Sequence, residues 1–290
     1  MVHSEHRVRG ATYIVVSCVA FSAMAVLVKY IAYVDAFKTS LARFMIGIAI
    51  LGTAALAGRI RLDFNDNKLL FLRGLVGGAG IVITFFVIVK IGIGKGTMLI
   101  STYPIFACIF AAILLKERLG KLTLPAVAVA IAGIYLLTKS NGTGLFNSFG
   151  FVEILAVFNG VMAGFAITLI RKLHRTDSSY SIFWAQCIVG FWLVLLPANA
   201  TSGQMLGWKE AIVLLLIGIA ATTGQLFMTA GYKYLPVRIG SILGMLEPTF
   251  NFFVGIILFA EPLSKNSLLG AMLIIGSCII VLTQTKKQQI

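Results

Sequence analysis

Ten long apolar runs constrain this chain more than any other feature. Each run covers about 18 to 25 residues, enough for an α-helix to cross a hydrocarbon core of about 30 Å. The chain is 59% hydrophobic and only 12% charged, whereas soluble domains have about 25% charged residues. A membrane β-barrel would show alternating segments of about ten residues instead. We therefore predict an all-α integral membrane protein, with spans at 11–31, 36–58, 68–90, 94–115, 121–138, 149–171, 178–198, 209–232, 237–260 and 265–284.

Basic residues set the expected orientation of the spans. Ten spans place both termini on one side of the membrane. If that side is the cytoplasm, the inner segments hold sixteen Lys and Arg residues, Arg73 among them, and the outer ends hold seven. Cytoplasmic loops carry an excess of Lys and Arg. The split predicts cytoplasmic termini, and it accounts for the net charge of +14 without a nucleic-acid partner.

The sequence repeats itself after 144 residues. The segment "STYPIFACIFAAILLKERLG" at 101–120 aligns with "MLEPTFNFFVGIILFAEPLS" at 245–264. We predict two copies of five spans, residues 1–140 and 141–290. Because five is odd, the second copy enters the membrane from the opposite side. Inverted repeats of this kind are typical of secondary transporters, whose substrate site lies near the midplane between the copies.

A proline occupies the same place in both copies. Pro104 aligns with Pro248, and each lies near the middle of a span. Proline has no N–H, so the carbonyl four residues earlier, at Ile100 or Gly244, loses its helical partner. In hydrocarbon that carbonyl needs another helix, a hydroxyl or water. We expect a kink at both prolines, with polar backbone facing a central cavity.

Three segments carry a family resemblance. They are "VAFSAMAVLVKYIAYVDAFKTSLARFMIGIAIL", "YPIFACIFAAILLKERLGKLTLPAVAVAIAGIYLL" and "EPTFNFFVGIILFAEPLSKNSLLGAMLIIGSCIIVL". Each resembles EamA-type members of the drug/metabolite transporter superfamily, and the nearest type is the bacterial aromatic amino-acid exporters. The resemblance covers nearly the whole chain. It implies ten helices in two inverted five-helix repeats, a place in the bacterial inner membrane, and export of small metabolites, often amino acids.

Two charged residues inside spans are the main site candidates. An arginine within a helix costs roughly 3 kcal/mol or more to insert, so Arg43 should face the bundle. It either binds a substrate carboxylate or makes a fixed contact, with Glu247 or with backbone carbonyls. Glu247 lies at the centre of its span. It either couples transport to protons, binds a substrate amino group, or pairs with Arg43 or with the backbone that Pro248 exposes.

The other candidates for the cavity wall are polar and aromatic residues of several spans. They are Ser17, Phe21, Thr84, Phe85, Tyr103, Asn159 and Gln225. Aromatic walls with few polar groups suit an amphipathic small molecule, although a Phe stripe also serves packing. Glu153, near the outer end of its span, is expected to reach towards the interface. Glu117 and Glu261 are expected to pair with basic residues at helix ends.

Two other function classes stay open at this point. A membrane-embedded enzyme needs a constellation of acids or histidines, and all three histidines lie in polar segments. No G-x-x-x-x-G-K-[ST] motif for ATP is present, and the four cysteines lack metal-ligand spacing. We predict that the protein uses no cofactor or metal, is a monomer surrounded by membrane lipid, and binds a small-molecule substrate. The predicted function is export of small metabolites, above all amino acids, by alternating access through a central cavity, and proton coupling is one of the roles considered for Glu247. A passive channel or a membrane-embedded enzyme is the alternative.

Overall fold

The structure is a computed structural model that describes residues 2–117, 123–138, 150–200 and 207–260, with short pieces between 265 and 277. Every regular element in these residues is a helix. The helices are α1 (Val2–Tyr30), α2 (Ala36–Leu56), α3 (Asn67–Ile91), α4 (Ile93–Ile100), α5 (Tyr103–Leu115), α6 (Thr123–Thr138), α7 (Phe151–Leu173), α8 (Ser179–Ala200), α9 (Trp208–Tyr234), α10 (Val237–Gly244) and α11 (Leu246–Phe259). The predicted all-α fold is confirmed.

Eight stretches of the described residues are long and apolar enough to cross a membrane. Two of them, Ile93–Leu115 and Val237–Phe259, each combine two helices, α4 with α5 and α10 with α11. The predicted spans agree with these stretches to within a few residues, except that α1 begins before residue 11. The fifth predicted span corresponds to α6, which has 16 described residues. Most of the tenth, at 265–284, lies outside the described residues, as do Glu261 and Cys278.

The two broken spans share one backbone. Helix α4 ends at Ile100 and α10 ends at Gly244, and both helices begin 144 residues apart as well. The second pieces, α5 and α11, both end in a left-handed residue, Lys116 with φ 55° and Ala260 with φ 51°. These are the only two non-glycine residues with positive φ in the part of the chain that the structure describes. A left-handed residue commonly ends a helix, but the position is normally glycine. Its recurrence at one aligned position supports the duplication.

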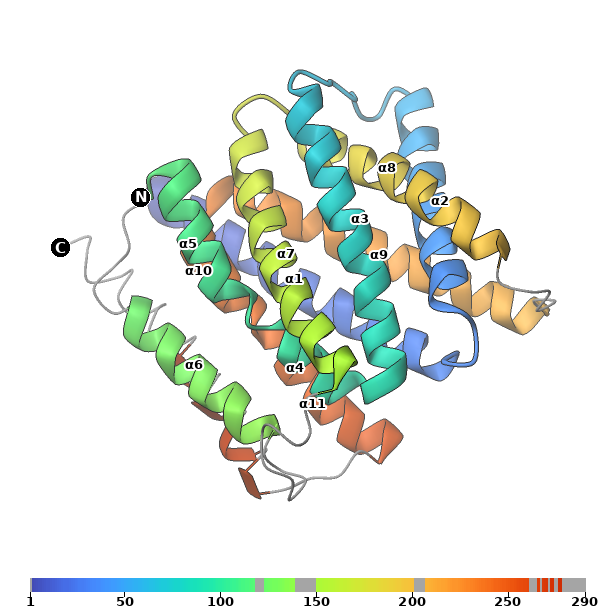
Figure 1. Cartoon of the computed structure of the whole chain (residues 1–290). Helices are drawn as coiled ribbons and strands as arrows, with labels where there is room; N and C mark the ends of the chain where they lie inside the picture. The colour runs from blue at the N-terminus through green and yellow to red at the C-terminus, as the bar shows by residue number, and fades with distance from the viewer. Residues whose placement is uncertain are drawn as a thin grey trace.

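The helices of each half pack mainly against helices of the other half. Helix α1 lies along α9, and α7 lies along α3 in the matching way. Helices α2 and α8 also pack against each other, and the broken spans meet through α4 with α11 and α10 with α5 (Figure 1). The core therefore lies between the halves. The breaks in the two central spans lie within that core.

Hydrogen bonds connect the linker between α2 and α3 to the linker between α7 and α8 and the start of α8. Asp177 accepts hydrogen bonds from the backbone N–H of Asn65 at 2.8 Å and of Asp66 at 3.4 Å. The Asn65 side chain donates to the carbonyl of Thr176 at 2.7 Å, and the Asp63 N–H donates to Ser181 Oγ at 2.9 Å. One edge of the bundle thus joins the two halves through their loops.

Candidate functional site

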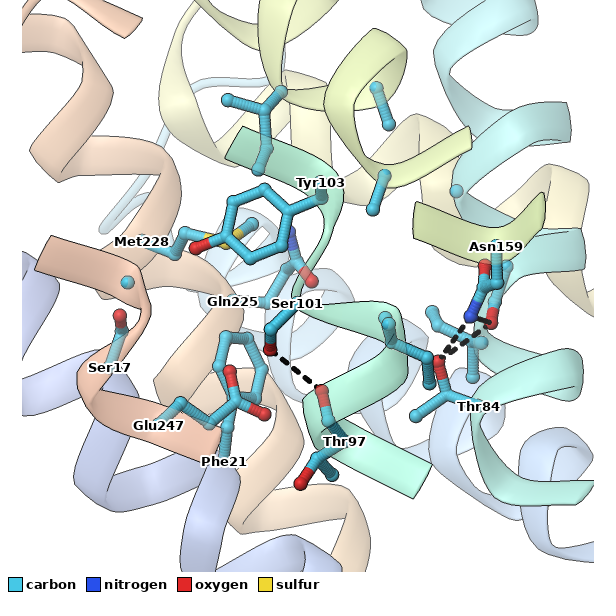
Figure 2. Close-up of a pocket in the computed structure, with 18 of the residues that line it drawn as sticks. Ser17, Phe21, Thr84, Thr97, Ser101, Tyr103, Asn159, Gln225, Met228 and Glu247 are labelled. Atoms are coloured by element: carbon cyan, nitrogen blue, oxygen red, sulfur yellow. Dashed lines mark hydrogen bonds between the residues drawn. The ribbon is translucent and has the colours of Figure 1, made fainter. Parts of the chain in front are cut away.

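A cavity of about 180 Å³ lies where the two halves meet. Its wall includes residues of α1, α2, α3, α4, α5, α7, α8, α9, α10 and α11, and it is mostly apolar. Figure 2 shows part of this wall, with side chains from the broken spans facing those of α1 and α9. Three charged side chains line the cavity among the described residues: Arg43, Arg73 and Glu247.

Eight of the nine residues expected at the cavity line it. They are Ser17, Phe21, Arg43, Thr84, Tyr103, Asn159, Gln225 and Glu247. Phe85 is the exception: its side chain is fully buried in the core next to the cavity. The guanidinium carbon of Arg43 lies 5.8 Å from the centre of the Phe85 ring. Thr84 and Phe85 are neighbours on one helix, so they cannot share one face, and Thr84 takes the cavity side.

Arg43 faces the bundle interior, with 4% of its surface exposed. Its Nη2 donates to Gln225 Oε1 at 3.4 Å, its Nη1 contacts the sulfur of Met24 at 3.2 Å, and its Nε has no partner in the described part of the chain. A sulfur and one long amide contact are weak partners for a guanidinium with five donors. The described residues contain no ion pair between Arg43 and Glu247. Arg43 thus keeps donors for a ligand.

Glu247 belongs to the first turn of α11. Figure 2 shows its carboxylate pointing towards the α4 side of the cavity, where Thr97 and Ser101 lie. No described residue donates a hydrogen bond to this carboxylate or forms an ion pair with it. Ser22 bonds only the backbone carbonyl of Glu247, at 3.4 Å. Glu247 is therefore an open acceptor on the cavity wall.

Arg73 is the functional candidate that the sequence analysis missed. The sequence places it among the basic residues of the inner segments, inside the span predicted at 68–90. Helix α3 begins at Asn67, so Arg73 lies in its second turn, and its side chain is 3% exposed and lines the cavity. Its Nε and Nη1 have no partner among the described residues. Hydropathy gives the membrane boundary only to within several residues, so the sequence alone does not distinguish an inward-facing arginine here from one that flanks the membrane.

A hydroxyl group donates to a carbonyl near each of the two helix breaks. In the first half, the carbonyl of Thr97 keeps its backbone hydrogen bond from the Ser101 N–H at 3.0 Å and also accepts one from Ser101 Oγ at 2.7 Å, the second of which Figure 2 shows. The matching carbonyl of the second half belongs to Ser241, and Met245, the counterpart of Ser101, has no hydroxyl. The hydroxyl of Tyr103, from the other half, donates to the Ser241 carbonyl at 2.8 Å instead. Both prolines fall in the turn that follows each break.

Asn159 and Thr84 form a polar contact on another wall of the cavity (Figure 2). Asn159 Nδ2 donates to Thr84 Oγ1 at 2.9 Å and to the carbonyl of Gly80 at 3.0 Å. Ser17 Oγ donates to the carbonyl of Ile14 at 2.7 Å within α1. The amide oxygen of Asn159 and the hydroxyl lone pairs remain as acceptors for a ligand.

Two ion pairs hold α7 near its ends. At the first end, Lys95 of α4 donates to Glu153 at 2.8 Å. Glu153 is only 7% exposed and lies in the first turn of α7. At the other end, Glu117 Oε1 lies 4.0 Å from Arg171 Nε and accepts from the N–H of Val237 at 3.5 Å. The expected pairing of Glu117 is confirmed, and burial raises the pKa of its carboxyl.

The EamA-like transporter family matches residues 8–139 and 150–283. The chain belongs to this family. The family match and the spans together make the chain a multi-pass membrane transporter rather than an enzyme, with a small molecule as substrate. One matched stretch lies within each of the predicted copies, 1–140 and 141–290.

The chain is similar to known transporters in sequence and to a solved structure in fold. The pseudopaline exporter CntI of Pseudomonas aeruginosa is 25% identical over 96% of this chain and 97% of its own length. Solute carrier family 35 member G1 of Mus musculus is 23% identical over 94% of this chain and 77% of its own length. A crystal structure 16% identical in sequence aligns with a TM-score of 0.70 over 99% of both chains, which shows the fold.

Proposed function

We propose that this EamA-like transporter exports small metabolites that carry an amino group and a carboxylate, by alternating access through the central cavity. The observation that carries the proposal is the pair of opposite charges on the cavity wall. Arg43 and Glu247 both line the cavity, yet they form no ion pair with each other in the described residues. A buried charge needs a partner, and a zwitterion supplies one for each. Amino acids and their derivatives have this pattern.

Alternating access fits the duplicated backbone. Two halves with the same backbone give two nearly equivalent arrangements, one open to each side of the membrane. The breaks in the central spans let α4 and α10 move against α5 and α11. The ion pairs of Glu153 and Glu117 lie near opposite ends of α7, where each can close one entrance.

We further propose that the chain lies in a bacterial inner membrane with both termini in the cytoplasm. Most basic residues then lie on the inner side, as the distribution of Lys and Arg in membrane proteins favours. The pseudopaline exporter among the relatives supports outward transport. A reporter that is active only in the cytoplasm, fused to Ile290, should be active; a stable but inactive fusion would contradict this topology.

Glu247 is the titratable group proposed to couple transport to protons. It has no fixed partner among the described residues, and its helix begins at the break beside Pro248. Protonation can therefore follow the side to which the cavity opens. The alternative for the same residue, binding of the substrate amino group, requires the same open carboxylate.

Transport by purified protein in proteoliposomes tests the proposal. Radiolabelled amino acids should leave vesicles at a saturable rate, and a pH gradient should accelerate the efflux. Unlabelled substrate on the opposite side should drive counterflow, because a carrier exchanges substrate and a channel does not. Glu5→Gln makes the same change as Glu247→Gln at an exposed acid, so it serves as the control for that variant and should behave like the parent. Efflux without saturation or counterflow would favour a passive channel.

A further inference from the structure

We propose that Arg73 binds a second carboxylate, so that the transported metabolite carries two carboxylates and one amino group, as acidic amino acids do. This inference rests on the proposed function, because it assigns a substrate class to the same cavity. The contacts of Arg73, its missing partners and the charge of the cavity wall each support it.

The guanidinium of Arg73 is turned into the bundle. A Cβ at position 77 would overlap Arg73 Nη1 and would lie 3.0 Å from Gln186 Nε2. Only glycine leaves room for the guanidinium to lie there, against the next turn of α3 and beside α8. A basic residue that anchors a helix at the membrane surface extends towards the headgroups instead. The position of Arg73 is that of a binding residue.

Arg73 has no acceptor among the described residues. Neither a carbonyl, a carboxylate nor an amide oxygen bonds its guanidinium there, and its Nε and Nη1 are buried without partners. A guanidinium carries five donors that need acceptors when it is removed from water. A purely structural arginine would hold backbone carbonyls or an acid, as Arg171 does with the carbonyls of Tyr232 and Lys233 at 3.0 and 2.6 Å.

The charges of the cavity wall specify the ligand. Arg43 and Arg73 are positive and Glu247 is negative, and these are the charged residues that line the cavity in the described part of the chain. A monocarboxylate amino acid would compensate only one guanidinium and leave the other buried without a counter-charge. A ligand with two carboxylates and one ammonium group balances all three side chains. Arginine suits this role because its planar fork binds carboxylates through two parallel hydrogen bonds.

Transport of matched acid and amide pairs tests the inference. Glutamate and glutamine, or aspartate and asparagine, have nearly the same shape and differ by one charge. The parent should transport the acid with a KM lower by about tenfold or more, since a hydrogen bond to a charged group is worth about 1.5–3 kcal/mol. Arg73→Gln should bring the acid-to-amide ratio close to one. Arg73→Lys should restore part of it, since lysine keeps the charge and loses the fork.

Arg59→Gln is the matched control, because Arg59 is an exposed arginine in the linker after α2. Its acid-to-amide ratio should equal that of the parent. If the parent moves the amides as well as or better than the acids, the second-carboxylate site is refuted while the proposed function stands. If the parent transports other amino acids but none of these four, the second-carboxylate site is again refuted and the proposed function stands. If it moves no amino acid at all, the proposed function fails with it.

Thermal unfolding of the purified protein gives a readout that does not need transport. A ligand that binds only the folded state raises the Tm. Glutarate, which has two carboxylates, should raise the Tm of the parent more than butyrate does at equal ionic strength. Arg73→Gln should reduce this difference, and Arg59→Gln should not. An equal rise with chloride would mean that the two arginines hold an inorganic anion, which would overturn the inference.

Discussion

The phenol of Tyr103 donates a hydrogen bond of 2.8 Å to the backbone carbonyl of Ser241. The bond joins α5 of the first half to α10 of the second half, at the edge of the cavity. Tyr103 is also the repeat counterpart of Glu247. The duplicated position thus carries two different groups, one that ties the halves together and one that is left open to a ligand.

Breaking this bond should weaken the contact between the halves. Tyr103→Phe removes the donor and should lower the free energy of unfolding by about 1 kcal/mol, the usual net value of a hydrogen bond. Gly244→Ala should disrupt the same contact from the other side, because its Cβ would overlap the Tyr103 hydroxyl. With Phe at 103 the nearest atom of the ring would be an ordinary 3.4 Å away. The alanine should therefore cost less in the Tyr103→Phe background, and unfolding of the four proteins would measure this; purely additive effects would contradict it.

Glu247→Gln should separate the roles proposed for this carboxylate. Glutamine preserves the size and cannot ionise. If Glu247 couples transport to protons, the variant should bind substrate and lose the acceleration by a pH gradient. If it binds the amino group, substrate affinity should fall at every pH. Efflux identical to the parent at all pH values and gradients would remove Glu247 from the mechanism.

Arg43→Ala should lower transport by about tenfold or more, because the substrate carboxylate loses a charged donor. Arg43→Lys should recover only part of the activity, since an ammonium group cannot reproduce the planar fork. Initial efflux rates from proteoliposomes, normalised to folded protein, provide the measurement. Normal transport by the alanine variant would show that Arg43 does not bind the substrate.

His174 should make stability depend on pH. Its Nε2 lies 2.7 Å from the carbonyl of Thr229, and burial lowers the pKa of the imidazole below its usual value of about 6.5. In the interval between the lowered and the usual pKa, the unfolded chain binds the proton and the folded protein does not. Stability should thus fall as the pH drops below about 6.5 and level off once the folded pKa is passed.

His174→Asn removes the titrating group and provides the comparison. The Tm of the parent in detergent should decrease more between pH 7.5 and pH 5.5 than that of the variant. Equal decreases would mean that other groups cause the pH dependence. His6→Asn, at a histidine that stacks on Tyr234 near the start of α1, controls for the loss of any imidazole.

The spans and the duplication could be predicted from the sequence, because a span is a local pattern and a duplication is an internal sequence repeat. A run of apolar residues reports the membrane directly, and Pro104 and Pro248 mark one position in two copies. The helix face on which Phe85 lies could not be predicted. A helix that is apolar on all sides gives no signal for which side meets the cavity. The bond between Tyr103 and Ser241 depends on two segments 138 residues apart, and no pattern within either segment indicates it.

The charged site was predicted in part. A single Arg or Glu in the middle of an apolar run stands out, which identified Arg43 and Glu247. Arg73 did not stand out, because it lies near a span end that is rich in basic residues. Its glycine neighbour at position 77 lies one turn further along the helix. An arginine followed four residues later by glycine inside a span is therefore a pattern to examine for a guanidinium that folds inward.

The hydrogen-bonded linkers, between α2 and α3 and between α7 and α8, bear on how the two halves can move against each other. Asp177, Asn65 and Asp63 connect the two halves by hydrogen bonds along one edge, so we expect that edge to act as a hinge. Displacement about a hinge grows with distance from it, and the broken spans lie away from these loops (Figure 1). A crosslink across the two linkers should then spare turnover, whereas one that joins α4 to α11 should stop it.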